Sequence, residues 1–242
     1  MNIKNGRKNL DKSFAKMKHI VVLTGAGMSA ESGVKTFRDH DGLWEGHDVM
    51  KVASPKGFAN NPELVLDFYN QRRRQLKTVE PNQAHKDLAA LEVDYKVTIV
   101  TQNVDDLHER AGSSDVVHLH GELLKIRSTG NYNDIQVWTE DINLGDTCKK
   151  GYQLRPHIVW FGEDVPMIET AVKICYAADI LIIIGTSMQV YPAASLINYV
   201  QPDTTIFYID PKPAISNAGK VNVIAKSATE GMKELISILK TS

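Results

Sequence analysis

Short runs of apolar, mostly β-branched residues recur along the chain, and most of them show no alternation of polar and apolar positions. A strand that is buried on both faces of a sheet has this pattern, whereas a half-exposed strand alternates. The pattern therefore predicts strands at residues 19–23, 96–101, 116–119, 179–184, 204–209 and 221–224.

Stretches with the spacing of an amphipathic helix lie between these runs. The clearest covers residues 62–76: it begins at Pro62, which suits the first turn of a helix, and continues through Leu64, Phe68 and Leu76. Strands that alternate with helices are typical of an α/β fold with a doubly wound, parallel, Rossmann-like sheet. Further helices are predicted at residues 82–91, 166–177 and 230–239.

Two segments do not follow the alternation of strand and helix. Residues 34–95 have the pattern of helices and loops, and residues 121–154 hold scattered polar and aromatic residues with weak strands near Ile126 and Val137. We expect these two insertions to form a smaller second domain, with a ligand in the cleft between the domains. The larger, nucleotide-binding domain would then consist of residues 1–33, 96–120 and 155–242.

The composition mainly excludes classes of protein. The 242 residues include 28 basic and 29 acidic side chains, so no overall field favours nucleic acid or an anionic membrane. Two cysteines do not make a disulfide framework, and they favour a reducing compartment. The polar N-terminus is not followed by the apolar stretch of a secretory signal, and the longest apolar run, Ile180 to Ile184, is too short to cross a bilayer. We expect a cytoplasmic monomer that binds neither nucleic acid nor membranes.

A glycine-rich loop follows the first predicted strand. Gly25, Gly27 and Ala30 fit the pattern G-x-G-x-x-A between a strand and a helix, where the backbone can approach a pyrophosphate. An ordinary glycine turn is the alternative. A dehydrogenase would show a second strand ending in an acidic residue about 20 positions further on, and the sequence GLWEGHDVMKVASPKGF does not have that pattern. The loop thus favours a dinucleotide site but argues against hydride transfer.

Five motifs occur in a fixed order along the chain. Residues 25–38 fit G-A-G-x-S-x-x-S-G-[IV]-x-x-F-R, and TQNVD, HLHGE, VWFGE and GTS follow at residues 101–105, 118–122, 159–163 and 185–187. Together these motifs resemble those of the sirtuins, the NAD-dependent protein-lysine deacylases, and especially the bacterial branch related to the mitochondrial desuccinylase. The resemblance implies NAD as a consumed co-substrate and an acyl-lysine protein or peptide as substrate. It also implies nicotinamide and O-acyl-ADP-ribose as products.

The resemblance also assigns roles to single residues. His120 matches the catalytic histidine, and an imidazole is a suitable base near neutral pH. Asn103 and Asp105 fit the nicotinamide carboxamide, because both carry acceptors for its NH2 group; a helix cap before DLHER is the alternative. His118 is expected on the opposite face of its strand, as a structural residue. The expected NAD-binding residues are Gly25, Ala26, Gly27, Ser29, Glu31, Phe37, Arg38, Gln102, Asn103, Asp105, Gly185, Thr186, Ser187, Asp210 and Ala228.

The predicted helix 62–76 carries a signal for the acyl group. Tyr69 and Arg72 are three positions apart and share a helix face, and a hydroxyl with a guanidinium can bind a carboxylate. The pair resembles the Tyr-x-x-Arg of sirtuins that remove succinyl, malonyl and glutaryl groups. We expect Arg73 and Arg74 to be solvated, and a surface role for all three arginines is the alternative. The expected substrate-binding residues are Ala53, Tyr69, Arg72, Val159 and Phe161, with Ala53 widening the acyl pocket and the last two lining the lysine channel.

The chain departs from most sirtuins at the structural zinc site, which two C-x-x-C pairs form in the small domain. Segment 121–154 contains only Cys148, with Ser128 near the start of the first pair, and Cys175 lies on a later predicted helix. One thiol does not make the site, so we expect no zinc. We expect an apolar cluster to hold this segment instead, formed by Ile135, Val137, Trp138, Ile142, Leu144 and Tyr152.

Two other functions remain open at this point. A mono-ADP-ribosyltransferase or NAD glycohydrolase would use the same activated ribose carbon with another nucleophile, and the pair Tyr69 and Arg72 argues against it. A non-catalytic sensor of NAD or ADP-ribose would bind without turnover, and the presence of His120 and Asn103 argues against that.

Overall fold

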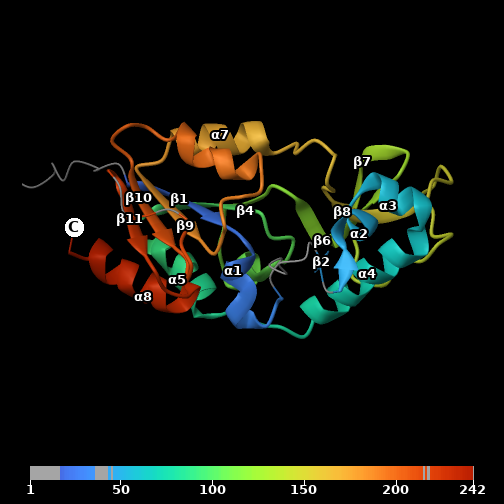
Figure 1. Ribbon diagram of the computed structural model, residues 1–242, viewed down its shortest axis with the longest axis horizontal. Coiled ribbons are helices and arrows are strands. Elements are labelled where there is room, and N and C mark those ends of the chain that lie inside the picture. Colours follow the sequence, from blue (N-terminus) through green and yellow to red (C-terminus); the bar gives the residue numbers. More distant parts are fainter. Residues whose placement is uncertain (1–16, 36–42, 45, 215, 217–218, 242) are drawn as a thin grey trace, which may run out of the picture.

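Parallel strands form the centre of the larger half of the molecule. Figure 1 shows the computed structural model, which describes residues 17–35, 43–44, 46–214, 216 and 219–241. Within these residues the sheet has the order β11-β10-β9-β1-β4-β5, and each pairing is parallel. Each strand lies where an apolar run predicts it. The strands are β1 (His19–Thr24), β4 (Lys96–Thr101), β5 (Val116–His118), β9 (Ile180–Ile184), β10 (Thr205–Ile209) and β11 (Val221–Ile224).

Helices cover both faces of this sheet, as Figure 1 shows. Along β1, Ile20 and Val22 pack towards α5 (Gln83–Ala90) and α8 (Ala228–Leu239). Val21 and Leu23 pack towards the opposite layer. That layer consists of α7 (Ile168–Tyr176) and a 3-10 segment, η3 (Ala193–Tyr199). A strand with both faces buried needs apolar residues at successive positions, so the predicted doubly wound α/β fold is confirmed.

A smaller antiparallel sheet lies beside the parallel one. In the part of the chain that the structure describes, its order is β7-β6-β8, and a group of helices packs with it. The elements of this half are β2 (Leu43–Trp44), β3 (His47–Asp48), α2 (Val49–Val52), α3 (Pro55–Asn60), α4 (Pro62–Leu76), β6 (Gly121–Ser128), β7 (Asn131–Val137) and β8 (Leu154–Ile158). Short helical elements elsewhere are α1 (Ala26–Ser29), η1 (Ala30–Ser32), η2 (Leu91–Val93) and α6 (Leu107–Arg110).

The packing differs from the expected domain division at two places. Helix α5 lies within residues 34–95, yet its Ala84 and Leu88 belong to the core of the parallel sheet. All but the first residue of strand β8 lies within the segment assigned to the large domain, yet the strand pairs with β6 of the small sheet. The covalent order of elements does not decide which sheet an element packs against, since that depends on where its apolar face finds a partner.

The expected apolar cluster of segment 121–154 is largely wrong. Ile142 is buried and Trp138 packs beside it, but the other four members are exposed. The core found there consists of Leu66, Ile126, Ile142, Cys148 and Leu154, with Phe58 and Trp138 at its edge. Helix α4 supplies Leu66, so four residues of the segment itself are buried together against a helix from outside it. The four exposed members are Ile135, Val137, Leu144 and Tyr152.

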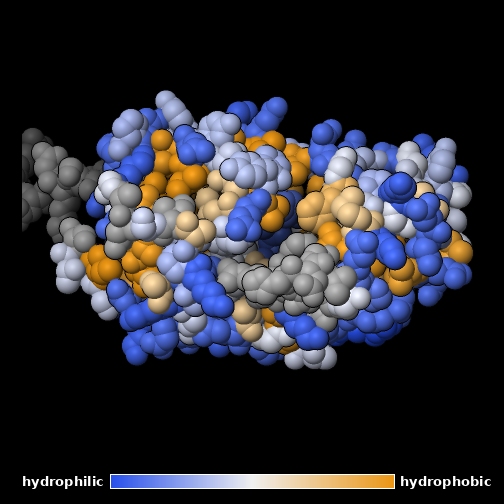
Figure 2. Space-filling view, in the orientation of Figure 1, coloured by the Kyte–Doolittle hydropathy of each residue, from blue (hydrophilic) through white to orange (hydrophobic). Residues whose placement is uncertain are grey.

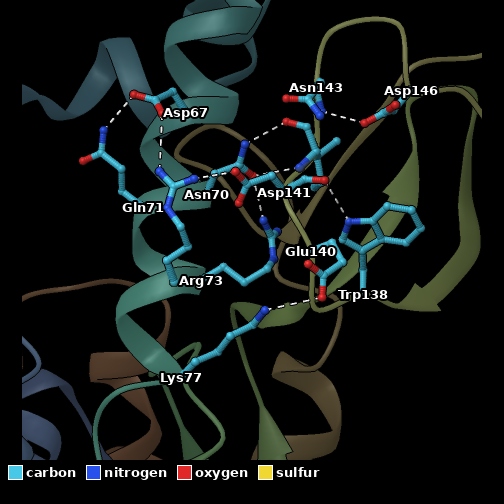
Figure 3. Close-up of polar contacts among 12 residues, drawn as sticks. Asp67, Asn70, Gln71, Arg73, Lys77, Trp138, Glu140, Asp141, Asn143 and Asp146 are labelled. Carbon is cyan, nitrogen blue, oxygen red and sulfur yellow. Dashed lines mark hydrogen bonds and ion pairs between the residues drawn. The ribbon is translucent and has the colours of Figure 1, made fainter.

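Polar contacts along α4 add to this attachment, as Figure 3 shows. The Asn70 amide donates to the Ile142 carbonyl and accepts from the Ile142 amide, both at 2.9 Å. Arg73, expected to be solvated, is fully buried, and its guanidinium donates to Asn70 Oδ1 at 2.8 Å and to the Leu123 carbonyl at 3.1 Å. That expectation was wrong because β6 packs over this face of α4. Arg74 is half exposed and pairs with Asp141.

Candidate active site

The glycine loop after β1 lies against the turn after β9. The Gly25 amide donates to the Ile184 carbonyl at 3.1 Å, and the Gly27 amide donates to the Gly185 carbonyl at 2.8 Å. Gly185 has a φ of +62°, and a side chain there would come within 2.3 Å of the Met28 nitrogen. Both loops follow the carboxyl ends of neighbouring parallel strands, the usual ligand-binding edge of such a sheet. Three of the expected NAD-binding glycines therefore share one edge.

Ser29, Asn103 and Asp105 form a buried hydrogen-bonded cluster at the same edge. The Asn103 side-chain amide donates to Ser29 Oγ at 3.1 Å, and Ser29 Oγ donates to Asp105 Oδ2 at 2.9 Å. Burial raises the pKa of Asp105, although the Ser29 hydroxyl and the Leu107 amide donate to the carboxylate and oppose the rise. The cluster presents an amide and a carboxylate side by side, as binding of a carboxamide requires.

His120 follows β5, beside this cluster. Its Nδ1 lies 3.1 Å from the Gln102 carbonyl oxygen. A carbonyl can only accept, so the proton is on Nδ1 and the Nε2 lone pair is available as a base. Burial lowers the pKa of His120, partly offset by the bond to Gln102, so the neutral form prevails at pH 7. This is the protonation state that a general base needs.

His118 has a different environment. Its Nδ1 donates to the Asn103 carbonyl at 3.0 Å, and its Nε2 lies 2.7 Å from the Glu109 carboxylate. Burial disfavours the charged imidazole, but the bond and charge of Glu109 outweigh it and raise the pKa of His118. These contacts tie the backbone of Asn103 to α6. They agree with the structural role expected for His118.

Gln102 and Thr186 join the two neighbouring loops. Gln102 Nε2 donates to Thr186 Oγ1 at 3.2 Å, and the buried Tyr208 hydroxyl donates to the Thr186 carbonyl at 2.8 Å. The Tyr208 hydroxyl thereby fixes the turn that carries Thr186. Ser187 follows as a half-buried residue, and Ala26 opens α1.

The remaining expected NAD-binding residues are more dispersed. Glu31 accepts from the Thr229 amide and hydroxyl, at 2.9 and 2.7 Å, and from Ser227 Oγ at 3.1 Å. Burial would raise the pKa of Glu31, but these bonds lower it, so the carboxylate holds the start of α8 beside Ala228. Asp210 is buried after β10 and accepts from the Lys212 amide. Phe37 and Arg38 lie outside the described residues.

The expected acyl-binding pair lines a cavity of about 60 Å³ that also reaches Asp105. Tyr69 is fully buried, and Arg72 lies with its guanidinium carbon 3.6 Å from the centroid of the Phe68 ring. The cavity also has Trp44 and Leu123 in its wall. Residues from α4 and from the turn after β4 thus meet in one pocket.

The segment after β8 connects His120 to this pocket. The Val159 amide donates to the His120 carbonyl, and the Phe161 amide donates to the Ala53 carbonyl, both at 2.9 Å. Four expected site residues therefore lie along one hydrogen-bonded path. Between them, Trp160 is buried and donates through Nε1 to the Tyr69 hydroxyl at 3.0 Å. Our sequence analysis missed Trp160, although its position inside the VWFGE motif could have drawn attention to it.

The residues near Cys148 do not fit a zinc site. Ser128 Oγ donates to Cys148 Sγ at 3.3 Å, so a hydroxyl occupies the place where a second thiolate would be required. Among the residues that the structure describes, no group of three or more His, Cys, Asp or Glu side chains is arranged to hold a metal ion. The expectation of a protein without zinc stays a prediction.

The described part of the chain contains no helix that is long and apolar enough to cross a membrane. The surface shown in Figure 2 is hollowed between the two halves of the molecule, with polar and apolar residues around the hollow.

Comparisons with known proteins agree with this geometry. A model of the Sir2 family matches residues 25–192. An NAD-dependent protein deacylase of Helicobacter pylori is 59% identical over 221 residues, which cover 91% of this chain and 96% of that protein. Another, of Bacteroides thetaiotaomicron, is 52% identical over 230 residues, which cover 92% and 98%. The chain therefore belongs to the Sir2 family.

Solved structures support the same assignment. A Sir2 homologue in complex with NAD is 40% identical with a TM-score of 0.83, over 93% of this chain and 91% of that one. A Sir2 protein with a deacetylated p53 peptide and 3′-O-acetyl ADP-ribose is 26% identical with a TM-score of 0.77, over 92% and 94%. These comparisons confirm the predicted family and fold. They also confirm the predicted enzyme class, an NAD-dependent protein deacylase.

Proposed function

We propose that this chain removes succinyl and malonyl groups from protein lysines, and acetyl groups as well, with NAD as the consumed co-substrate. The observation that carries the proposal is the shared cavity. Tyr69 and Arg72, which suit an acyl carboxylate, line the same pocket as Asp105, which suits the nicotinamide carboxamide. An acyl group in this pocket would lie next to the reacting end of NAD.

The surroundings of Arg72 suit a carboxylate. Its guanidinium lies over the rings of Phe68 and Trp44, at 3.6 and 5.3 Å from their centroids, and it donates to the Phe68 carbonyl at 2.9 Å. These contacts hold the planar group in one orientation, and a guanidinium can bind a carboxylate through two parallel hydrogen bonds. A neutral acetyl group has no carboxylate for the Arg72 guanidinium to bind.

NAD supplies an activated ribose carbon with nicotinamide as the leaving group. Asn103 and Asp105 would hold the carboxamide of that group. Val159 and Phe161 would enclose the lysine stem and keep water from the reacting atoms. The Nε2 of His120 would then accept a proton from a ribose hydroxyl, and its lowered pKa supplies the neutral imidazole for this step.

The names of the relatives support the activity and its product class. The Helicobacter pylori and Bacteroides thetaiotaomicron proteins are called NAD-dependent protein deacylases, and one Sir2 protein is solved with an acetyl ADP-ribose. We propose the corresponding O-acyl-ADP-ribose as the product of this chain. We also propose a cytoplasmic monomer that does not bind nucleic acid, in line with its formal net charge of -1. Size-exclusion chromatography with light scattering would test the monomer.

The test is mass spectrometry of the purified protein with NAD and matched succinyl-lysine and acetyl-lysine peptides. We expect faster removal of succinyl, with release of nicotinamide and O-succinyl-ADP-ribose. The Arg72→Met variant should lose succinyl removal and keep acetyl removal. Arg74→Met is the matched control, because Arg74 lies on the same helix and is half exposed, in a surface pair with Asp141.

Other outcomes would identify the other functions. Acetyl removal alone would contradict the preference for acidic groups and leave a deacetylase. Nicotinamide release without change to either peptide would indicate ADP-ribosyl transfer or NAD hydrolysis. Binding of NAD without any turnover would indicate a sensor.

A further inference from the structure

The hydroxyl of Tyr69 is buried with a single hydrogen-bond partner among the described residues. It accepts from the indole Nε1 of Trp160 at 3.0 Å. An indole N–H can only donate, so the tyrosine oxygen is the acceptor and its own proton remains available. Burial raises the pKa of Tyr69, so this proton is retained at neutral pH. The bond from Trp160 therefore makes the Tyr69 hydroxyl a donor towards any ligand in the pocket.

Contacts on several sides fix the direction of the Trp160 N–H. The Arg155 guanidinium carbon lies 3.2 Å from the centroid of the indole ring, and the Phe58 ring lies 5.2 Å from it. Glu163 accepts from the Arg155 guanidinium at 2.6 Å and from the Trp160 amide at 2.8 Å. The Glu163 carboxylate thus holds both the backbone of Trp160 and the Arg155 guanidinium that is stacked on the indole ring. A ring held in this way has little freedom to turn its N–H away from Tyr69.

The position of Trp160 in the chain couples it to the rest of the site. Its neighbours Val159 and Phe161 are bonded through their amides to His120 and Ala53. Phe161 is 44% exposed whereas Trp160 is 2% exposed, so adjacent side chains of this segment face different surroundings. One segment therefore supplies the expected lysine channel and, from its buried residue, the contact to Tyr69.

We propose that Trp160 is a positioning residue for acyl specificity, which directs the proton of the Tyr69 hydroxyl towards the carboxylate of an acidic acyl group held beside Arg72. This inference rests on the proposed function. Consecutive hydrogen bonds polarise one another, so the bond from Trp160 also strengthens the bond that Tyr69 donates. An acetyl group has no carboxylate, and its removal does not depend on this orientation.

The test compares Trp160→Phe with the wild-type enzyme on succinyl-lysine and acetyl-lysine peptides. Phenylalanine keeps an aromatic ring and removes the N–H. We expect the KM for the succinyl peptide to rise about tenfold, which corresponds to about 1.4 kcal/mol, with kcat for both peptides and the acetyl KM unchanged. Trp138→Phe is the matched control: its Nε1 donates to the Asp141 carbonyl at 3.2 Å in the same domain, away from Tyr69. This control should leave all four constants unchanged.

A double-mutant cycle shows whether Trp160 acts through Tyr69. In a Tyr69→Phe background, Trp160→Phe should have no further effect on the succinyl KM, because the hydroxyl that it orients is absent. Additive effects would overturn the proposal, and so would an equal loss of succinyl and acetyl removal by Trp160→Phe. If Trp160→Phe does not fold, replacement of Trp160 by benzothienylalanine keeps the shape of the indole and removes only the N–H.

The outcomes separate this inference from the proposed function. A wild-type enzyme that removes acetyl but not succinyl groups contradicts the acyl preference and with it the role of Trp160. A wild-type enzyme that prefers succinyl, loses this preference in Arg72→Met and keeps it in Trp160→Phe contradicts only the role of Trp160.

Discussion

The hydroxyl of Ser29 donates a hydrogen bond to the Asp105 carboxylate at 2.9 Å, across 76 positions of the chain. The same hydroxyl accepts from the Asn103 amide at 3.1 Å. One small side chain of the glycine loop thereby orients both groups that are proposed to hold the nicotinamide carboxamide. The bond also stabilises the charged form of Asp105, whose pKa burial raises.

Replacement of Ser29 by alanine should weaken NAD binding in a pH-dependent way. The ionised Asp105 carboxylate is a much stronger acceptor for the carboxamide NH2 group than the protonated acid, so activity should fall as the pH drops through its pKa in the folded protein. Loss of the Ser29 bond raises that pKa further, and the acid limb of kcat/KM for NAD should move to higher pH. At pH 7.5 the KM for NAD should rise about tenfold, as expected for a hydrogen bond to a charged group.

Ser32→Ala is the control for this prediction. The Ser32 hydroxyl is buried on the turn after α1 and has no hydrogen-bond partner within the described ranges. Its loss should leave the pH profile unchanged. An unchanged acid limb in Ser29→Ala would show that Asp105 does not have to be ionised for NAD binding.

Adjacent arginines on α4 should differ strongly in their effect on stability. Arg73 is fully buried, where desolvation lowers its pKa to about 10, and its removal leaves a cavity and an unpaired Leu123 carbonyl. Arg73→Ala should lower the free energy of unfolding by about 3 kcal/mol. Arg74→Ala should lower it by less than about 1 kcal/mol, as is usual for an exposed ion pair. Urea unfolding followed by circular dichroism measures both, and equal effects would contradict the difference in burial.

Burial of His85 should make the protein sensitive to acid. The ring is fully buried 4.8 Å from that of His108, and desolvation lowers the pKa of His85 to about 4. In the unfolded chain the pKa of His85 is near 6.5, so the unfolded state binds a proton at a higher pH than the folded state does. The contribution of neutral His85 to the free energy of unfolding is therefore complete above pH 6.5 and is lost as the pH falls towards 4. Between pH 7 and pH 5 the loss is about 2 kcal/mol.

His85→Leu should remove this part of the pH dependence. Unfolding free energies at pH 7 and pH 5 give the comparison, with His47→Leu as a control at a half-buried position. The same slope in His85→Leu and in the wild type would mean that the pKa of His85 does not differ between the folded and the unfolded protein.

The purified protein should contain no zinc. One thiol, Cys148, with the Ser128 hydroxyl beside it does not supply the ligands of a tetrahedral site, and the segment is held by burial of Ile126, Ile142 and Leu154 against α4. We expect far less than one zinc per chain by elemental analysis, and the same melting temperature with and without EDTA. One zinc per chain, or a fall in melting temperature with EDTA, would contradict this prediction.

The sequence by itself determined the parallel sheet and the family to which the chain belongs. A strand buried on both faces must be apolar at successive positions, so runs such as residues 180–184 identified their strands without reference to their partners. The motifs around Gly25, Asn103 and His120 follow the ends of such strands. Parallel strands present their carboxyl ends at one edge of the sheet, so the meeting of these residues could be predicted as well.

Only the tertiary structure decided which of two neighbouring residues is buried. Arg73 and Arg74 are neighbouring residues of the same type, and the local sequence does not distinguish them. In the structure β6 covers Arg73 and leaves Arg74 half exposed. Ile135 and Val137 are apolar and yet exposed on β7, while the core of that segment comes partly from α4. The bond from Trp160 to Tyr69 joins residues 91 positions apart. Burial and long-range hydrogen bonds depend on which surfaces meet, and local pattern does not contain that information.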